Sequence, residues 1–146
     1  MNGKLLLIML AGRRAVLPAA EVNSVIELSE VTPVPRTPPH IAGLSALRSR
    51  PLTIVDCAAA LGLTATEPDW RRQRAVVVEY EGHLYGLLVD AADDIIDALD
   101  DPRPLGADPG AAWEAAALGR VETKAGALLL LDVGALITGP LQASAA

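Results

Sequence analysis

The sequence is poor in the residues from which catalytic and metal sites are built. Among 146 residues it has one cysteine, Cys57, and two histidines, His40 and His83. This supply excludes an internal disulfide and is too small for a conventional zinc site. There is no Gly-x-Gly-x-x-Gly or Walker loop to cradle a nucleotide, and neither histidine lies near a nucleophile elbow. We therefore predict no catalytic residue, no metal and no cofactor.

Basic residues and long apolar runs are also scarce. Twelve Lys and Arg stand against 18 Asp and Glu, so the net charge is −6. Without a basic stripe, we expect binding neither to nucleic acid nor to an anionic membrane surface. The apolar run at 5–11 is far shorter than the ~18 residues of a membrane helix, so we expect no membrane insertion. Because a similar run recurs at 75–78, we interpret 5–10 as a strand rather than a signal sequence, and the lone cysteine favours the cytoplasm.

What the sequence does contain is a repeated pattern of elements in a chain that is 51% apolar. Few identities survive between the two copies, but their order and spacing do. With Gly12 aligned on Gly82, residues 5–8, 15–17 and 25–26 fall on 75–78, 85–87 and 95–96; with Gly43 aligned on Gly119, residues 52–56 fall on 128–132. The repeat predicts two similar subdomains in a single domain at 1–140. We place them at about 5–63 and 75–138, with a linker at 64–74 and a frayed tail at 141–146.

The spacing of short apolar runs between Gly and Pro turns predicts a mainly β protein, built as small barrels or a sandwich. Expected strands include 5–10, 14–17, 52–55, 75–80, 84–89 and 127–131. Asp56 and Asp132 are placed to cap two short helices at 58–61 and 133–137. A helical turn is expected within 19–28 and another within 113–118.

Several side chains allow more than one interpretation. Trp70 and Trp113 are either core residues or interface anchors. Cys57 is expected to be a small buried hydrophobic residue, and His40, within a proline-rich loop, a surface residue. Arg48 is either an ordinary turn residue or an exposed charge on a partner-binding face, where a guanidinium can hold a carboxylate bidentately.

Six aspartates lie between positions 90 and 101 and invite comparison with a calcium loop. An EF-hand needs Gly at its sixth position and Glu at its twelfth, and counting from Asp90 those positions hold Ile95 and Asp101. We therefore interpret the run as a solvated acidic edge that deters pairing between sheets.

From Gly43 onward the sequence resembles the CheW-like domain family. The residues 43–48 read Gly-Leu-Ser-Ala-Leu-Arg and continue through Pro51 to Val55-Asp56. The family signature here is Gly, an apolar and a small residue, Asn-Leu-Arg-Gly, an apolar run, Pro and Val-Asp-Leu. Val22-Asn23-Ser24-Val25 before the proline-rich loop, and Gly86 to Asp90, follow the family pattern as well. The resemblance covers residues 4–138.

The resemblance implies two small five-stranded Src-homology-3-like β-barrel subdomains, packed about a shared apolar seam, with a few short helices. It also implies a non-enzymatic chemotaxis adaptor that couples the regulatory domain of a CheA-type histidine kinase to the cytoplasmic tip of methyl-accepting chemoreceptors. We expect a cytoplasmic monomer, recruited to membrane-associated receptor arrays. The partner-binding residues that the resemblance implies are Val22, Ser24, Gly43, Ala46, Arg48 and Ser49.

Three positions depart from the family pattern: Ala46 replaces Asn, Ser49 replaces Gly, and Ser24 replaces Glu, whereas Arg48 is retained. Losing Asn and Glu removes polar contacts to a helical partner. One alternative is therefore a divergent module that binds another kinase or a response regulator, without receptor binding. Another is an enzyme or ligand-binding barrel, which predicts a pocket with converging polar groups in the seam between the lobes.

Overall fold

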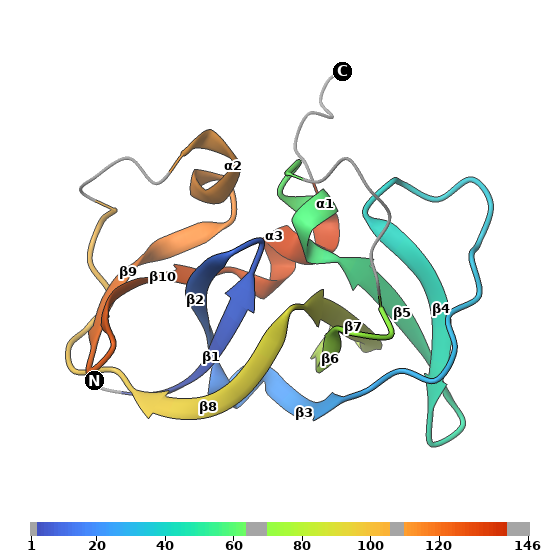
Figure 1. The fold of residues 1–146 in the computed structure, drawn as a ribbon, viewed down its shortest axis with the longest axis horizontal. Helices are drawn as coiled ribbons and strands as arrows, with labels where there is room; N and C mark the ends of the chain where they lie inside the picture. Colours follow the sequence, from blue (N-terminus) through green and yellow to red (C-terminus); the bar gives the residue numbers. More distant parts are fainter. Residues whose placement is uncertain (1–2, 64–69, 106–109, 140–146) are drawn as a thin grey trace.

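The computed structural model describes residues 3–63, 70–105 and 110–139, and in these the chain is mainly β. Within that part of the chain, ten strands form two five-stranded sheets that lie side by side, with short helices between and beside them (Figure 1). The elements are β1 (Lys4–Leu10), β2 (Arg13–Pro18), η1 (Ala19–Glu21), β3 (Val22–Ile26), β4 (Ile41–Leu47), β5 (Arg50–Asp56), α1 (Cys57–Ala60), β6 (Arg74–Tyr80), β7 (His83–Val89), β8 (Ala91–Asp97), α2 (Ala111–Glu114), β9 (Ala117–Thr123), β10 (Gly126–Leu131) and α3 (Val133–Thr138).

The repeat predicted from the sequence is present in the order of the elements. Strands β1–β5 are followed by α1, and β6–β10 are followed by α3. The two predicted caps are confirmed: the Asp56 carboxylate accepts from the Ala59 amide at 3.3 Å, and Asp132 accepts from Gly134 at 3.0 Å. Each cap satisfies a backbone N–H that the first turn of a helix leaves without a partner.

The sheets do not coincide with the two halves of the sequence. Sheet A has the order β8-β1-β2-β10-β9, and sheet B has the order β3-β6-β7-β5-β4. Each sheet thus takes its first hairpin, β1–β2 or β6–β7, from one copy of the repeat and its other strands from the opposite copy. The parallel pairs β2–β10 and β5–β7 join the copies. The predicted subdomains 5–63 and 75–138 therefore describe the repeat but not the sheets, and residues 64–69 of the predicted linker lie outside the described residues.

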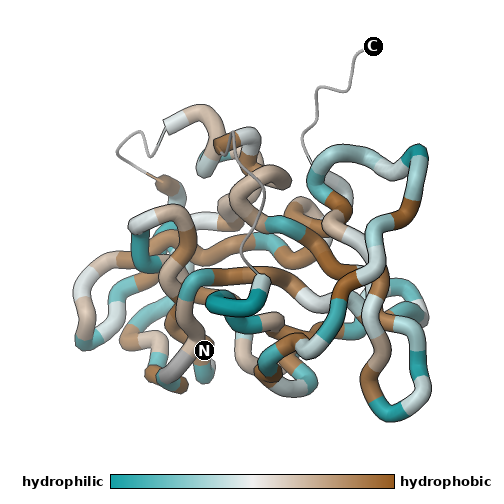
Figure 2. The backbone as a smooth tube through the Cα atoms, turned by 45° about the vertical axis from the view of Figure 1, so that its right-hand side comes forward, coloured by the Kyte–Doolittle hydropathy of each residue, from teal (hydrophilic) through white to brown (hydrophobic). Residues whose placement is uncertain are grey.

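The largest core cluster lies between the sheets and under the helices. It contains side chains from both sheets, among them Leu17, Val76, Leu87 and Leu131, which are at most 2% exposed. Apolar segments accordingly run through the strands, and the hydrophilic ones lie mostly in turns and loops (Figure 2). Leu136 of α3 joins the same cluster, so the final helix closes the seam between the sheets. Burying these side chains in a shared core makes the two sheets one cooperative unit.

The structure resolves the open interpretations of the buried side chains. Trp113 is 7% exposed and belongs to the central cluster. Trp70 is partly buried against the core of sheet B, and the guanidinium carbon of Arg71 lies 4.5 Å from the centroid of its ring. Cys57 is fully buried, as predicted, and burial raises the pKa of its thiol far above the ordinary value. It is therefore a packing residue rather than a reactive thiol.

The prediction that His40 is a surface residue is wrong. Its side chain is 3% exposed, and Nε2 donates to the carbonyl oxygen of Ile137 at 2.8 Å. The amide of Asp56 in turn donates to the His40 carbonyl at 2.7 Å. The last carbonyls of a short helix lack partners within the helix, and an imidazole N–H from the loop before β4 satisfies one of them. His40 thereby ties sheet B to the end of α3.

The middle of the acidic run lies on β8, an edge strand of sheet A, as the edge interpretation predicted, and Asp100 and Asp101 follow that strand. Lys4 Nζ contacts Asp97 at 2.7 Å, and Arg103 contacts Asp100 at 2.6 Å. Among the described residues, no group of three or more Asp, Glu, His or Cys side chains is arranged to hold a metal ion. In the same residues, no helix has the length and apolar character needed to cross a membrane.

Candidate functional site

The predicted partner-binding residues lie at the two edges of sheet B. Val22 and Ser24 are on β3, Gly43 and Ala46 are on β4, and Arg48 and Ser49 form the turn between β4 and β5. Strands β6, β7 and β5 separate β3 from β4 in the sheet order. The six residues are therefore not one contiguous strip along the sheet, and only the four on the β4–β5 hairpin are neighbours in it.

The segment between the two edges returns to β4 and covers part of its outer side. Thr32 and Leu44 exchange two backbone hydrogen bonds, at 2.8 and 2.9 Å. Gly43 makes this approach possible, because a Cβ at its position would meet the carbonyl of Thr32, with the carbonyl carbon at 2.9 Å. Gly43 is buried. Its role in the predicted face is therefore to shape the backbone rather than to contact a partner.

The exposed part of the hairpin consists of Leu44, Ala46, Arg48, Ser49 and Arg50, which we call the β4 strip. Leu44 is 41% exposed, a high value for a leucine. Because side chains alternate along a strand, Leu44 and Ala46 point to the same, outward face. The strip thus offers an apolar patch that ends in two arginines, and such a patch suits a partner with an apolar face and a carboxylate.

The Arg48-Ser49 turn is held in an unfavourable backbone conformation. Arg48 has φ of 51° and Ser49 has φ of 72°, both in the left-handed region. The two-residue turns Ala11-Gly12 and Glu81-Gly82 also have positive φ at both residues, but in each of them the second residue is glycine. A two-residue hairpin turn of type I′ matches the strand twist and needs positive φ at both positions. The hairpin therefore keeps the glycine-type turn although serine replaces glycine.

Substitution of Ser49 by glycine should stabilise the protein. Glycine adopts positive φ without a Cβ penalty, so we expect Ser49→Gly to raise the free energy of unfolding by about 1 kcal/mol. The matched control is Gly82→Ser, which places serine at the same position of the β6–β7 turn, where φ is 84°. It should lower stability by a similar amount in urea titrations. Equal stability of wild type and Ser49→Gly would show that the turn carries no strain.

At the other edge, β3 is irregular. Its pairing with β6 shifts register between Val22 and Ser24, which is a β-bulge. Bulges at sheet edges redirect side chains and interrupt pairing with further strands. Val22 and Ser24 are half-buried, and Asn23 between them is exposed. Ser24 therefore gives this edge a small hydroxyl where the related pattern has a carboxylate.

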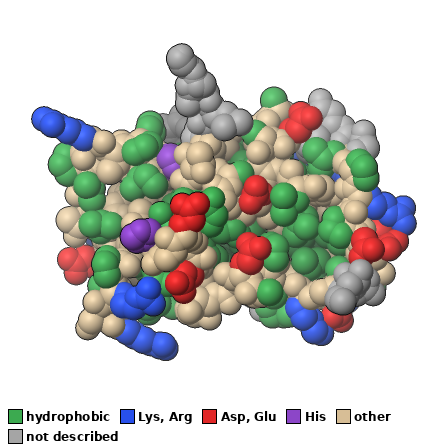
Figure 3. Space-filling view, turned by 180° about the vertical axis from the view of Figure 1, so that it is seen from behind, with side chains coloured by type: hydrophobic (Ala, Val, Ile, Leu, Met, Phe, Trp, Pro, Cys, Tyr) green, Lys and Arg blue, Asp and Glu red, His purple; other side chains and the backbone are tan. Residues whose placement is uncertain are grey.

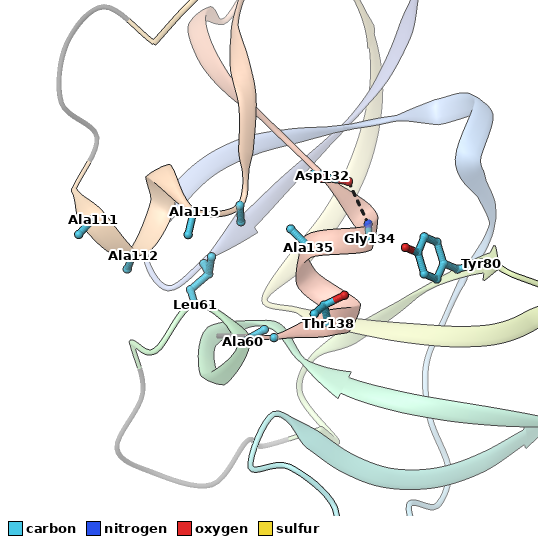
Figure 4. Close-up of a pocket in the computed structure, with 12 residues that line it drawn as sticks. Ala60, Leu61, Tyr80, Ala111, Ala112, Ala115, Asp132, Gly134, Ala135 and Thr138 are labelled. Atoms are coloured by element: carbon cyan, nitrogen blue, oxygen red, sulfur yellow. Dashed lines mark hydrogen bonds between the residues drawn. The ribbon is translucent and has the colours of Figure 1, made fainter. Parts of the chain in front are cut away.

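Two cavities lie beside α3, and the sequence had not pointed to them. One, of about 590 Å³, is lined by alanines of α1, α2 and α3 together with Tyr80 and Asp132 (Figure 4). The second, of about 670 Å³, is lined by η1, β3, the β6–β7 turn and the start of α3. Neither has a His, Cys, Lys or Arg among the described residues that line it. The polar side chains that line them are Tyr80, Asp132 and Thr138 in the first, and Glu21, Asn23, Glu79, Tyr80, Glu81 and Asp132 in the second.

The chain is similar to proteins of one family. The family model described as the CheW-like domain matches residues 4–140. Chemotaxis protein CheW of Rhizobium meliloti (strain 1021) is 41% identical over 69 residues, which cover 47% of this chain and 44% of that protein. The probable chemotaxis protein CheW of Rhizobium etli is 35% identical over 83 residues, 55% of this chain and 53% of that protein. The matched segments thus span about half the length of these curated relatives.

A solved structure shares the fold. The crystal structure of the scaffolding protein TtCheW from Thermoanaerobacter tengcongensis superposes with a TM-score of 0.76 at 24% identity. The superposition covers 91% of this chain and 90% of that one. At this identity, the likeness shows the fold alone.

Proposed function

Because the chain belongs to the CheW-like domain family, we propose that it is a non-enzymatic chemotaxis adaptor, which couples a CheA-type histidine kinase to the cytoplasmic tips of chemoreceptors. The observation that carries the proposal is the match of the family model to residues 4–140, nearly all of the chain. The fold is compatible with it, since two similar sheets offer two similar surfaces to two partners. We further propose that the protein works in the cytoplasm, as a monomer when it is outside a receptor array.

For the receptor contact, we propose the β4 strip at one edge of sheet B, with Val22 and Ser24 at the other edge as a second contact. An apolar side of a receptor helix would lie against Leu44 and Ala46, both exposed. The guanidinium of Arg48 would bind a carboxylate of that helix in a bidentate pair. Positive φ at Arg48 and Ser49 fixes the direction in which the arginine leaves the hairpin.

Reversing the charge of Arg48 tests this face. We expect Arg48→Glu to weaken binding of a receptor-tip fragment by about tenfold or more, because it replaces an attraction with a repulsion. Binding of a CheA regulatory domain, circular dichroism and melting should not change. The control is Lys124→Glu, an exposed residue of the corresponding turn between β9 and β10. Wild-type affinity of Arg48→Glu for the receptor fragment would refute the assignment.

Titration calorimetry of the wild-type chain separates the coupling adaptor from the second candidate. That candidate is a divergent CheW-like module serving another kinase or a response regulator, and the absence of Asn at Ala46 and of Glu at Ser24 favours it. Binding of both the kinase domain and the receptor fragment supports the coupling adaptor. Binding of the kinase domain alone supports the divergent module. If neither the kinase domain nor the receptor fragment binds, both candidate functions are rejected.

A further inference from the structure

A third cavity opens at one end of the core of sheet A, and it has a volume of about 470 Å³. Its walls come from β1, β2, η1, β9, β10 and the segment that follows β8. The cavity lies beside the start of β1, the strand that begins near the N mark in Figure 1. None of Val22, Ser24 and the residues of the β4 strip lines it. We call it the sheet A cavity.

The walls of the sheet A cavity are mainly apolar. Leu5, Ala98, Val121 and Leu130 line it, and each is at most 7% exposed and belongs to the core cluster of sheet A. Strands β1 and β10 are each paired on both sides, so these walls cannot move in to fill the space without breaking backbone hydrogen bonds. A cavity of this size with apolar walls and few polar groups is typical of a small-molecule site.

The mouth of the sheet A cavity carries one charge of each sign. Among the described residues that line it, Lys4 and Asp100 are the only charged ones. Lys4 Nζ lies 2.7 Å from Asp97, and Arg103 Nη2 donates to Asp100 at 2.6 Å, so both charges are already paired. Figure 3 likewise shows acidic and basic side chains next to one another at its right-hand margin, the side of sheet A. A charged ligand would lose hydration there without gaining an unpaired opposite charge, which favours an uncharged ligand.

The internal repeat shows what covers the corresponding place in sheet B. With the two copies aligned on their paired glycines, four lining residues have counterparts in the core cluster of sheet B: Leu5, Pro18, Ala98 and Leu130 correspond to Ala75, Leu88, Leu28 and Ile54. Trp70 is partly buried against that cluster, and it precedes β6 as Gly3 precedes β1. An indole ring therefore covers, in sheet B, the place that stays open in sheet A.

Two differences between the copies leave the sheet A cavity open. Ala98 has a shorter side chain than Leu28, the residue at the same place in sheet B. Trp70 lies four residues before β6, whereas Gly3, the described residue that precedes β1, has no side chain. The space that remains therefore has the position that an aromatic ring and a leucine side chain take in sheet B.

We propose that the sheet A cavity binds a small, uncharged aromatic molecule about the size of indole. Its ring packs against Leu5, Val121 and Leu130, in the position that corresponds to Trp70 of sheet B. Burial of the ring among aliphatic side chains supplies the free energy of binding. The inference goes beyond the coupling of kinase and receptor and does not rest on it, because no residue proposed for the receptor contact lines the cavity.

Titration of indole into the ¹⁵N-labelled full chain tests the cavity. Indole should shift the amide signals of Leu5, Ala98 and Val121 to saturation, and those of Ile54 and Leu88 in sheet B should not move. It should also raise the melting temperature, because a ligand that binds only the folded state stabilises that state. If these signals do not shift up to the solubility limit of indole, or if the shifts are confined to other surfaces, the proposal is wrong.

Two charged compounds with the same ring test whether the ligand is uncharged. Indole-3-acetate is an anion and tryptamine is a cation at neutral pH, and we expect each to bind at least about threefold more weakly than indole. Equal or tighter binding of either compound would refute the uncharged assignment.

Substitution of Ala98 by the corresponding residue of sheet B tests the position of the ligand. Ala98→Leu places in the cavity the side chain that Leu28 has in sheet B, so it should weaken indole binding by about tenfold or more. The control is Ala127→Leu, the same change at an exposed alanine of β10 that does not line the cavity. It should bind indole as the wild type does. Wild-type affinity of a folded Ala98→Leu chain would contradict the proposal.

A second variant keeps the test independent of whether Ala98→Leu folds. Trp70→Ala removes the indole ring of sheet B, so added indole should bind there as well and shift the amide signals of Ile54 and Leu88. Indole should also recover part of the melting temperature that this variant loses. If Trp70→Ala gains no indole site in sheet B, the correspondence between the two places fails, and the aromatic assignment fails with it.

A blocked Gly-Trp-Gly peptide tests the source of the ring. If the peptide shifts the cavity signals and indole does not, the cavity takes a tryptophan side chain of another protein, and the assignment to a small molecule is wrong. Arg48→Glu should bind indole with wild-type affinity. Loss of receptor binding in that variant with retained indole binding would support both proposals, whereas loss of indole binding would contradict a separate cavity.

Discussion

Cut within residues 64–69, the chain should yield two fragments that do not fold alone and that fold together when mixed. The N-terminal fragment holds β1–β5, η1 and α1, and the C-terminal fragment holds β6–β10, α2 and α3. Each sheet needs strands of both, because β1–β2 lies in sheet A with β8–β10, and β6–β7 lies in sheet B with β3–β5. A lone fragment leaves the edges of both incomplete sheets unpaired and their core faces in water.

Circular dichroism and denaturant titration of the separate and mixed fragments check this expectation. Neither fragment should show a cooperative transition, and the mixture should recover one with a concentration-dependent midpoint. A chain whose residues 64–69 are replaced by a Gly/Ser linker is the control and should fold as wild type. A cooperative transition of one fragment as a monomer would refute the dependence. A folded homodimer of one fragment would instead show that a second copy can supply the missing hairpin, as the internal repeat permits.

The order of the elements could be predicted from the sequence, whereas the pairing of the strands could not. Hydrophobic runs, glycine turns and the Asp caps are local features, so the repeat, the strands and both capped helices are confirmed. Which hairpin completes which sheet depends on pairs between the copies, parallel in β2–β10 and β5–β7 and antiparallel in β1–β8 and β3–β6. Because both copies have the same pattern, nothing in either half distinguishes its own hairpin from the other.

The same distinction holds for side chains. Arg48 and Ser49 were predicted at a turn, and that turn depends only on adjacent residues. His40 was assigned to the surface from its proline-rich neighbours, but its partner is a carbonyl 97 residues away. The second cavity beside α3 brings Glu21 together with Glu79 and Glu81, which lie about 60 residues further along the chain. The exchange of hairpins brings them together, so they were not found without the topology.

One long-range feature did leave a sequence signal, namely the paired glycines that define the repeat. Gly43 and Gly119 lie at corresponding positions of β4 and β9. At each, the loop that precedes the strand comes back to pair with it: Thr32 with Leu44, and Arg103 with Arg120. A Cβ at Gly119 would lie 2.6 Å from the Arg103 carbonyl oxygen. Both sheets therefore rely on a glycine to let a loop reach an edge strand.

Substitution of these glycines by alanine should be among the most damaging single-methyl changes in the protein. Gly119→Ala must displace the Arg103 carbonyl and weaken the two backbone hydrogen bonds of 2.8 Å between Arg103 and Arg120. We therefore expect the free energy of unfolding to fall by about 2–4 kcal/mol. Gly43→Ala has the same clash with Thr32 and adds backbone strain, because φ is 151°. It should cost more than Gly119→Ala and leave little folded protein.

Two other glycines provide matched controls that separate strain from contact. Gly12→Ala adds a Cβ where no atom lies within 4 Å, but φ is 79°. It should therefore lower the free energy of unfolding by only about 1 kcal/mol. Gly3→Ala has neither a close atom nor positive φ and should change stability by less than about 0.5 kcal/mol. Urea midpoints should therefore fall in the order Gly3→Ala, Gly12→Ala, Gly119→Ala, Gly43→Ala. If Gly119→Ala were no less stable than Gly12→Ala, the loop would not approach β9 so closely in solution. The backbone of Arg120 on β9 would then be available to pair with a partner strand.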